Sequence, residues 1–292
     1  MARANSLAAR TAQGPMVLAA IEQHEPPQRR LVDDGLAAVF LSAPLRRLVA
    51  LTRWAPMRAG LIALAGLLGP GLWVNLACRK RYIDDKLSAS RDSVDAVVIL
   101  GAGFDTRAYR LAHLGETPVY EVDLPVNVER KRAAVRHALG GLPPTVSLVA
   151  IDLETDELWD ALTAHGLRPD QRVFFIWEGV TQYLSTSAVR ATFEQLQQAA
   201  RGSRLVFTYI REDFIRGVDL HGAHLLYRRF RRRAQVWTFG LSPEAVRAFI
   251  GRYGWHMVEQ AGPDYLEHHY VRPTGRKLRA SQIEWSVYAE KR

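Results

Sequence analysis

Two closely spaced glycines mark the segment of this sequence that is best suited to bind a ligand. Gly101 and Gly103 end an apolar run and precede a polar stretch with helical character, in VVILGAGFDTRAYRL. Glycine permits a tight turn and lets a ligand approach the main chain closely. In an open α/β sheet, such a turn lies outside the carboxyl end of a strand, where these sheets bind ligands. We therefore expect Gly101 and Gly103 to cradle a ligand.

Acidic residues end the apolar runs that follow the glycines. Glu121 and Asp123 lie roughly twenty residues further on, at the spacing of an acid that binds ribose hydroxyls, and we expect at least one of them to do so. Asp152 and Leu153 end the next run, where a carboxylate can accept the adenine amine and a leucine can support the ring. An N-cap role for Asp152 in the following helix is the alternative. Glu178 ends a further run, facing the same ligand.

Two ligand classes compete for these residues, a dinucleotide and S-adenosylmethionine. The dinucleotide fingerprint requires a third glycine three residues after the second, for close packing of the helix on the strand. Thr106 occupies that position. This departure disfavours a nicotinamide-dependent oxidoreductase without excluding it.

The elements that position these residues alternate between short apolar runs and amphipathic stretches. This pattern is typical of a parallel sheet with helices on both faces. The last two strand candidates have no crossover helix between them, only a polar loop, so we expect an antiparallel hairpin. That hairpin distinguishes the methyltransferase form of the doubly wound α/β sheet from the dehydrogenase form. The candidate strands are 96–100, 119–123, 146–151, 173–177, 205–209, 257–260 and 284–289, and amphipathic helices are expected at 127–139 and 189–200.

A single domain over residues 1–292 is expected to contain four regions. They are a helical lid (1–90), a cofactor-binding core (91–210), an inserted helical cap (211–241, with a helix over 217–236), and a C-terminal helix and hairpin (242–292). Ser242, with proline after it, is expected to cap the C-terminal helix, which Gly254 ends. The apolar stretch 59–78 has the length of a membrane span, but the break at 69–71 favours two short helices. Peripheral contact with a membrane remains open.

Composition narrows the class of protein further. The 292 residues are 48% hydrophobic, enough for a sizeable core, and the single cysteine, Cys78, forms no internal disulfide. With no signal-peptide pattern at the N-terminus, we expect a cytoplasmic protein. The net charge of +9 arises largely in clusters at 78–82 and 227–233, which are typical of solvated helix faces. No base-holding motif accompanies them, so we expect no nucleic-acid partner. We also expect no metal, because there is a single cysteine and the fourth strand lacks clustered Asp and Asn ligands.

Taken together, these motifs resemble those of the leucine carboxyl methyltransferase family. LGAGFDTRAYRL, YEVDLP, IDL and WEGVTQYL occur in the family's order and spacing, and GWHMVEQAGPDYL and IEWSVYAEKR extend the resemblance over most of the chain. The sequence is most similar to the actinobacterial branch of small-molecule S-adenosylmethionine-dependent methyltransferases. The resemblance implies a role for each of seven residues. Gly101 would line the cofactor, Asp123 hold its ribose, Asp152 and Leu153 flank adenine, Glu178 complete the site, and Arg79 or Arg81 bind the methionine carboxylate.

The resulting expectation is an S-adenosylmethionine-dependent O-methyltransferase that esterifies the carboxylate of a hydrophobic small molecule. A carboxylate needs no general base, whereas a hydroxyl acceptor needs one, for which His221 and His224 are the candidates. Arg211 could pair with a substrate carboxylate, and Tyr209 could line the pocket. Hydroxyl methylation, methylation of a protein C-terminal carboxylate, and a catalytically silent binding protein remain alternatives.

Overall fold

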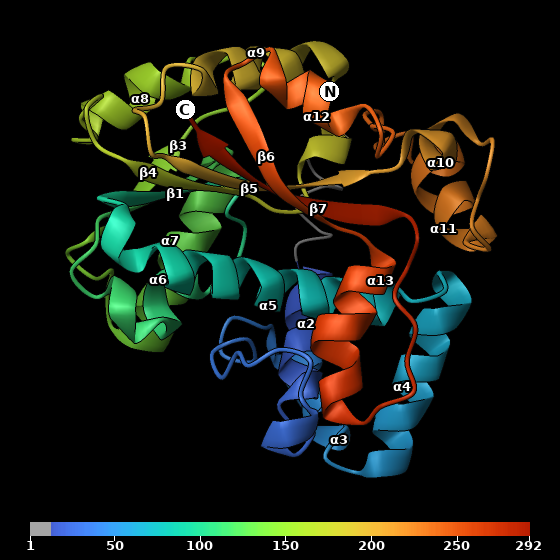
Figure 1. Ribbon diagram of the computed structural model, residues 1–292. Coiled ribbons are helices and arrows are strands. Elements are labelled where there is room, and N and C mark those ends of the chain that lie inside the picture. Colours follow the sequence, from blue (N-terminus) through green and yellow to red (C-terminus); the bar gives the residue numbers. More distant parts are fainter. Residues whose placement is uncertain (1–12) are drawn as a thin grey trace.

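A single seven-stranded sheet forms the centre of the molecule (Figure 1). The structure is a computed structural model that describes residues 13–292. The strand order is β3-β2-β1-β4-β5-β7-β6; β1 to β5 are parallel, and β7 runs antiparallel to both β5 and β6. The predicted mostly parallel sheet with a late antiparallel pair is therefore confirmed. The strands are β1 (Ala96–Leu100), β2 (Val119–Asp123), β3 (Val146–Ala150), β4 (Val173–Trp177), β5 (Arg204–Ile210), β6 (Trp255–Ala261) and β7 (Glu284–Lys291).

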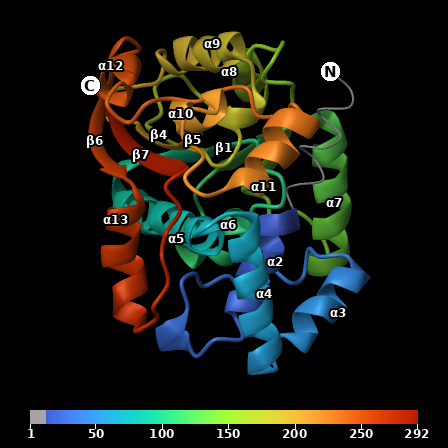
Figure 2. The same ribbon diagram turned by 90° about the vertical axis from the view of Figure 1, so that its right-hand side faces the viewer.

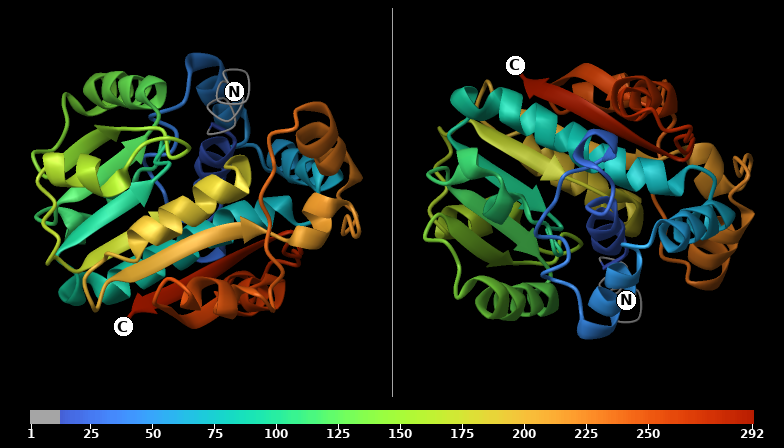
Figure 3. Two further views of the ribbon diagram at one scale, coloured as in Figure 1. Left: turned by 90° about the horizontal axis from the view of Figure 1, so that it is seen from above. Right: turned by 90° about the horizontal axis from the view of Figure 1, so that it is seen from below.

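Helices cover both faces of the sheet (Figures 1 and 3). One face carries α5 (Leu72–Ser90), α6 (Arg107–Arg110) and α7 (Pro125–Leu139). The other carries α8 (Leu158–Ala164), α9 (Thr186–Leu196) and α12 (Val246–Gly251). The side chains of β1 alternate between the two layers, because successive residues of a strand point to opposite faces. Val97 and Ile99 join the core beneath α5, while Val98 and Leu100 join the core beneath α9.

The N-terminal region packs against the far side of α5, as Figure 1 shows. It contains α2 (Gln13–Glu22), α3 (Ala43–Leu51) and α4 (Ala55–Leu68). Residues 69–71 separate α4 from α5, which confirms two helices in the apolar stretch, the second running on to Ser90. Gly71 has φ +72°, and a Cβ there would lie 2.3 Å from the Ser281 backbone nitrogen. The corner between α4 and α5 therefore requires glycine.

Membrane-spanning potential among residues 13–292 is limited to one bent pair. None of the helices described is by itself long and apolar enough to cross a bilayer. The pair α3 and α4 meets the criterion of length and composition only together, and its two helices are bent by 113°.

Three local expectations need correction. The cap has no single helix over 217–236: α10 (Glu212–Arg216) is followed by a loop, then by α11 (His224–Tyr227) and a π-helical stretch, η5 (Arg228–Arg233). The C-terminal helix begins at Val246 rather than beside Ser242, whose carbonyl accepts the Ala245 amide in a preceding turn. The β6–β7 connection is also not a simple loop, since it contains α13 (Pro263–Leu266) and two further helical turns.

Candidate active site

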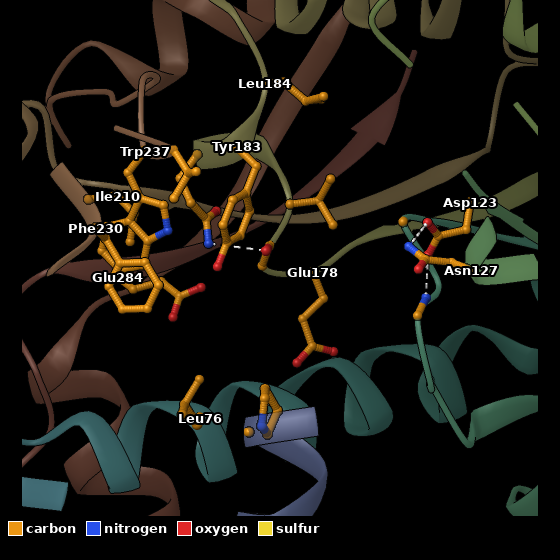
Figure 4. A pocket seen from close by; sticks show the side chains of 18 of the residues that line it. Leu76, Asp123, Asn127, Glu178, Tyr183, Leu184, Ile210, Phe230, Trp237 and Glu284 are labelled. Carbon is orange, nitrogen blue, oxygen red and sulfur yellow. Dashed lines mark hydrogen bonds between the residues drawn. The ribbon is translucent and has the colours of Figure 1, made fainter. Parts of the chain in front are cut away.

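A cavity of about 980 Å³ lies at the carboxyl ends of β1 to β4, enclosed by the lid and the cap (Figure 4). Ligand pockets commonly measure about 300–1,000 Å³, so this cavity lies at the upper end of that range. In Figure 4, Asp123 and Asn127 lie at one end, Phe230 and Trp237 lie at the other, and Glu178 lies between them. The cavity thus has a polar end and an apolar end.

The glycine turn forms one wall of the polar end. The amides of Gly101 and Ala102 both donate to the Val122 carbonyl, at 2.8 and 3.0 Å, so the turn is anchored to β2. Gly101 has φ +68°, and a Cβ at this position would lie 2.3 Å from Cγ2 of Val180. Both glycines line the cavity, as the sequence predicted.

Asp123 is held in place at the end of β2. Its Oδ2 accepts the Gly103 amide at 2.6 Å, and its Oδ1 accepts the Leu124 amide and Asn127 Nδ2, each at 2.7 Å. These donors fix the carboxylate beside the glycine turn, at the cavity wall.

Glu121, two residues earlier on the same strand, has a different environment. It is 1% exposed, and its carboxylate accepts bonds from Lys131 Nζ and Tyr109 Oη, both at 2.8 Å. Burial raises the pKa of Glu121 and outweighs the opposing effect of Lys131. Since it does not line the large cavity, the structure leaves only Asp123 of the two acids in reach of a ligand there.

Asp152 and Leu153 line the cavity next to Asp123. The Asp152 carboxylate accepts the Glu154 amide at 3.0 Å, which closes a local turn. The next helix, α8, starts only at Leu158 with Glu157 at its N-cap position. Asp152 is therefore not the N-cap residue of that helix.

Arg79 of α5 links the lid to two strand ends. Its Nε donates to Glu178, which follows β4, at 3.0 Å, and its Nη1 donates to both oxygens of Glu284, at the start of β7, at 2.6 Å. Gly179 leaves room for this guanidinium, because a Cβ there would lie 2.8 Å from Nη2. Arg81, the other candidate, lies outside the cavity, over the ring of Tyr270 at 5.4 Å.

Arg107 connects the glycine turn to the same network. It is fully buried and donates to Asp84 at 2.6 Å, to Glu178 at 2.8 Å, and to Asp105. Burial would raise the pKa of Glu178, but Arg107 and Arg79 outweigh it and hold that pKa below its usual value. Burial would likewise raise the pKa of Asp105, but the charge of Arg107 outweighs it and lowers that pKa. Both carboxylates are therefore ionised at neutral pH.

The apolar end of the cavity is built mainly by the cap and the lid. Two buried polar atoms face no partner among the described residues, Nε1 of Trp237 and Oε1 of Gln182. Arg229 and Arg233 of η5 also line the cavity, and no carboxylate in the part of the chain described here is paired with either. The apolar lining residues are Leu68, Leu72, Leu76, Ile210, Leu225, Leu226, Phe230, Val236 and Trp237.

Four residues that were expected to lie near the methyl acceptor do not line the cavity. Tyr209 points to the opposite face of the sheet, where its hydroxyl is bonded to Gln260 at 2.6 Å. Arg211 pairs instead with Asp213 at 2.6 Å. His221 lies 3.3 Å from the same Asp213.

His224 is exposed at the start of α11. None of the described residues that line the cavity is a histidine.

Several residues of the site were not predicted from the sequence. Arg107 lies in FDTRAYR directly after the glycine turn, and a weak signal was present in that motif, since Asp105 precedes the arginine by two residues and pairs with it. Gln182 lies only four residues after Glu178, in WEGVTQYL, so its proximity to the site was also indicated locally. Trp237 and Glu284 carry no such signal, because long-range folding brings them to the cavity.

The order of the strands, the late antiparallel strand and the cavity at the carboxyl ends define a class I methyltransferase fold. Residues 12–197 match the family model described as leucine carboxyl methyltransferase, which is well over half of the chain. The chain therefore belongs to the leucine carboxyl methyltransferase family, and the resemblance stated from the sequence is confirmed.

Mycobacterial relatives support this assignment. A protein of Mycolicibacterium smegmatis, provisionally named an S-adenosyl-L-methionine-dependent methyltransferase, is 33% identical over 259 residues, covering 84% of this chain and 81% of that protein. A similarly named protein of Mycobacterium marinum is 35% identical over 192 residues, covering 63% of this chain. That match spans only 61% of the M. marinum protein, less than two thirds of its length.

Solved structures agree on the fold. A DUF574 family protein from Streptomyces avermitilis superposes with a TM-score of 0.60 at 16% identity, covering 81% of this chain and 91% of that one. A protein from Thermobifida fusca that is provisionally described as a methyltransferase gives a TM-score of 0.59, also at 16% identity, covering 81% and 88%.

Proposed function

We propose that this protein is an S-adenosylmethionine-dependent O-methyltransferase that forms a methyl ester on the carboxylate of a hydrophobic small molecule. The observation that carries the proposal is the division of one cavity into a polar end, at the glycine turn, and an apolar end whose wall contains arginines but no histidine among the residues described. Family membership and the names of the mycobacterial relatives support the methyl donor.

The polar end fits the donor in shape and chemistry. Gly101 and Gly103 line the cavity, and the prepositioned carboxylate of Asp123 suits the two hydroxyls of a ribose. Asp152 and Leu153 would flank the adenine, while Arg79 and Glu178 would bind the methionine portion of the donor. When bound, S-adenosylmethionine supplies a methyl carbon made electrophilic by the adjacent sulfonium.

What the chain itself must do is hold the acceptor oxygen in line with that methyl group. Positioning of this kind is worth on the order of 7–11 kcal/mol of barrier reduction. Trp237 is suited to it, because its side chain lines the cavity and its buried indole N–H lacks a partner within the described part of the chain. A buried donor without a partner is costly, so an acceptor oxygen that takes this bond would be held firmly.

The choice of a carboxylate rests on what could remove a proton at the site. A hydroxyl acceptor requires a base poised near neutral pH, usually a histidine. The acids nearest the centre, Glu178 and Glu284, are engaged by arginines, and a lowered pKa makes Glu178 a weaker base. A carboxylate acceptor is already ionised, and Arg229 and Arg233 would attract it.

The test pairs calorimetry with a turnover screen. Titration with S-adenosylhomocysteine should show binding in the micromolar range, about −8 kcal/mol. Turnover should then be measured on matched pairs of an apolar carboxylic acid and the alcohol or phenol of the same skeleton. Methylation of the acids alone supports the proposal; methylation of the hydroxyl partners alone, or only of a protein C-terminus, overturns the acceptor assignment.

A variant locates the acceptor. Trp237→Phe keeps the ring but removes the N–H, so kcat should fall by about 10-fold or more while affinity for S-adenosylhomocysteine stays unchanged. Trp255→Phe is the matched control, because Trp255 is also buried with an unpartnered indole nitrogen but lies in the core beneath α9. Equal effects of the two variants on kcat would contradict a role for Trp237 at the acceptor.

A further inference from the structure

The polarity of α4 is inverted relative to that of an ordinary surface helix. Its one charged residue, Arg58, faces the protein, where its Nε donates to Glu25 at 2.7 Å and its Nη1 donates to the Thr52 carbonyl at 2.9 Å. None of its residues is buried, and its outward side is entirely apolar. A helix on the surface of a soluble domain normally turns its polar residues outward.

Together with the end of α3, this helix presents a cluster of large exposed apolar side chains, here called the α3–α4 face. Their exposed fractions range from 36% to 70%. Isolated exposed apolar residues need no explanation, but a contiguous group marks an interaction surface. The α3–α4 face consists of Leu51, Trp54, Met57, Leu64, Leu67 and Leu68.

The charge around this face has one sign. No aspartate or glutamate occurs from residue 35 to residue 83, whereas Arg46, Arg47 and Arg53 are exposed beside the apolar cluster. The neighbouring cap repeats the pattern, with five arginines in η5 and no acid from residue 220 to residue 243.

Helix α4 adjoins the cap, since α11 lies directly above α4 in Figure 2 and the two helices are in contact. The atoms that a Cβ on Gly69 would meet belong to Ala223 and Leu226, both at 3.6 Å. Leu68 of α4 and Arg229 of η5 both line the cavity. A molecule leaving the α3–α4 face would therefore meet the apolar end of the cavity.

We propose that the α3–α4 face, with the exposed Arg46, Arg47 and Arg53 beside it, binds the surface of an anionic lipid bilayer. Interfacial helices insert apolar and tryptophan side chains among the acyl chains while flanking arginines contact lipid phosphates. A second copy of this chain fits less well, since a two-fold contact would bring the arginines of both copies together. The binding stands independently of enzyme activity; the corollary that the acceptor enters from the bilayer rests on the proposed function.

Co-sedimentation with vesicles tests the proposal. The protein should bind vesicles of phosphatidylcholine and phosphatidylglycerol far better than phosphatidylcholine alone, and added salt should weaken that binding. The double variant Leu64→Gln/Leu67→Gln should partition at least about tenfold more weakly, because both leucines lose their burial in lipid. Arg46→Gln should cost about fivefold on anionic vesicles. Val258→Gln, an equally exposed apolar residue on β6, is the matched control and should bind as the wild type does.

A second readout locates the contact. Trp54 fluorescence should be quenched by brominated phospholipid in the vesicles, and Trp54→Phe should remove that component of the quenching. Absence of binding to anionic vesicles, or equal binding by the leucine double variant, overturns the proposal. So does a dimer in ultracentrifugation that the double variant splits, which would assign the face to a second copy.

Failure of the proposed function would look different. In that case the wild type would bind vesicles but neither bind S-adenosylhomocysteine nor methylate any acid. If the membrane proposal alone is wrong, a water-soluble acid should still be methylated without vesicle binding.

Discussion

Two neighbouring carboxylates on one strand lie in different environments, Asp123 at the cavity wall and Glu121 buried against Lys131, and two substitutions separate their effects. Asp123→Ala should weaken S-adenosylhomocysteine binding by about 1–3 kcal/mol through loss of charge-assisted ribose bonds. Glu121→Gln should leave that affinity unchanged but destabilise the fold, by about 3–5 kcal/mol, because Lys131 remains buried after losing the carboxylate that is paired with it. Calorimetry and urea unfolding measure the two effects. Unchanged affinity in Asp123→Ala would refute the ribose assignment.

The buried ion pairs predict how stability depends on pH. The pKa values of Glu178 and Asp105 are lowered in the fold from usual values of 4.5 and 3.8. At and below these usual pKa values, the unfolded state binds more protons than the folded state. The free energy of unfolding should therefore rise with pH, and the contribution of these two carboxylates should be lost as the pH falls below about 4.5.

Unfolding in urea between pH 3 and pH 7 checks this dependence. Glu178→Gln should reduce the slope in the acidic range by at most about 1.4 kcal/mol per pH unit. Asp170→Asn, at an exposed carboxylate, serves as the control and should keep the wild-type slope. An unchanged slope in Glu178→Gln would show that this pair does not govern acid stability.

Site residues that follow one another closely in the sequence could be predicted, whereas those brought together only by folding could not. The glycine turn and the acids at strand ends were recognisable because strand, turn and acid follow each other directly. The family resemblance pointed to Asp123, but from the residues alone the choice over Glu121 requires knowing that Lys131 of α7 folds back onto β2. The acceptor residues were misassigned because nothing local indicates that Tyr209 faces away from the cavity or that Trp237 faces into it.

At the scale of elements, the corner between α4 and α5 offers a sharp test. Gly71→Ala would place a methyl group 2.3 Å from the backbone nitrogen of Ser281 and 2.4 Å from the carbonyl carbon of Ala280, neither of which can turn aside. With the left-handed backbone adding about 1–2 kcal/mol, we expect substantial loss of stability in urea unfolding. Gly69→Ala, whose Cβ meets only ordinary contacts at 3.6 Å, should be tolerated. Equal stability of the two variants would contradict the corner as described.

Strands were predicted to within about two residues, whereas several helices were not. The strands lie in the core, so their apolar runs carry the signal directly. The helix bounds in the cap were not predicted correctly, because η5 is π-helical. An arginine-rich stretch has no apolar periodicity from which a π-helix could be recognised. The start of α12 was misjudged because a serine before a proline is also the beginning of a turn.

At the scale of the whole molecule, ligand binding should stabilise lid and sheet together. The cavity is lined by α2, α4, α5 and the strand ends, so a ligand there bridges separate elements. S-adenosylhomocysteine at about 100 times its Kd should add about 2.7 kcal/mol to the free energy of unfolding and raise Tm by several degrees. NAD and NADP should give no shift. Thermal denaturation with each ligand measures this, and stabilisation by NAD alone would favour an oxidoreductase.

The position of β7 between β5 and β6 has a consequence for how the chain folds as it is made. β5 pairs with β7 along its whole length, yet residues 211–283 are synthesised between them. At about 5–20 residues per second, the ribosome leaves the edge of β5 open for several seconds. An unpaired apolar edge is a template for pairing with other chains. The nascent polypeptide is therefore most vulnerable to aggregation in that interval, before β7 inserts and closes the sheet.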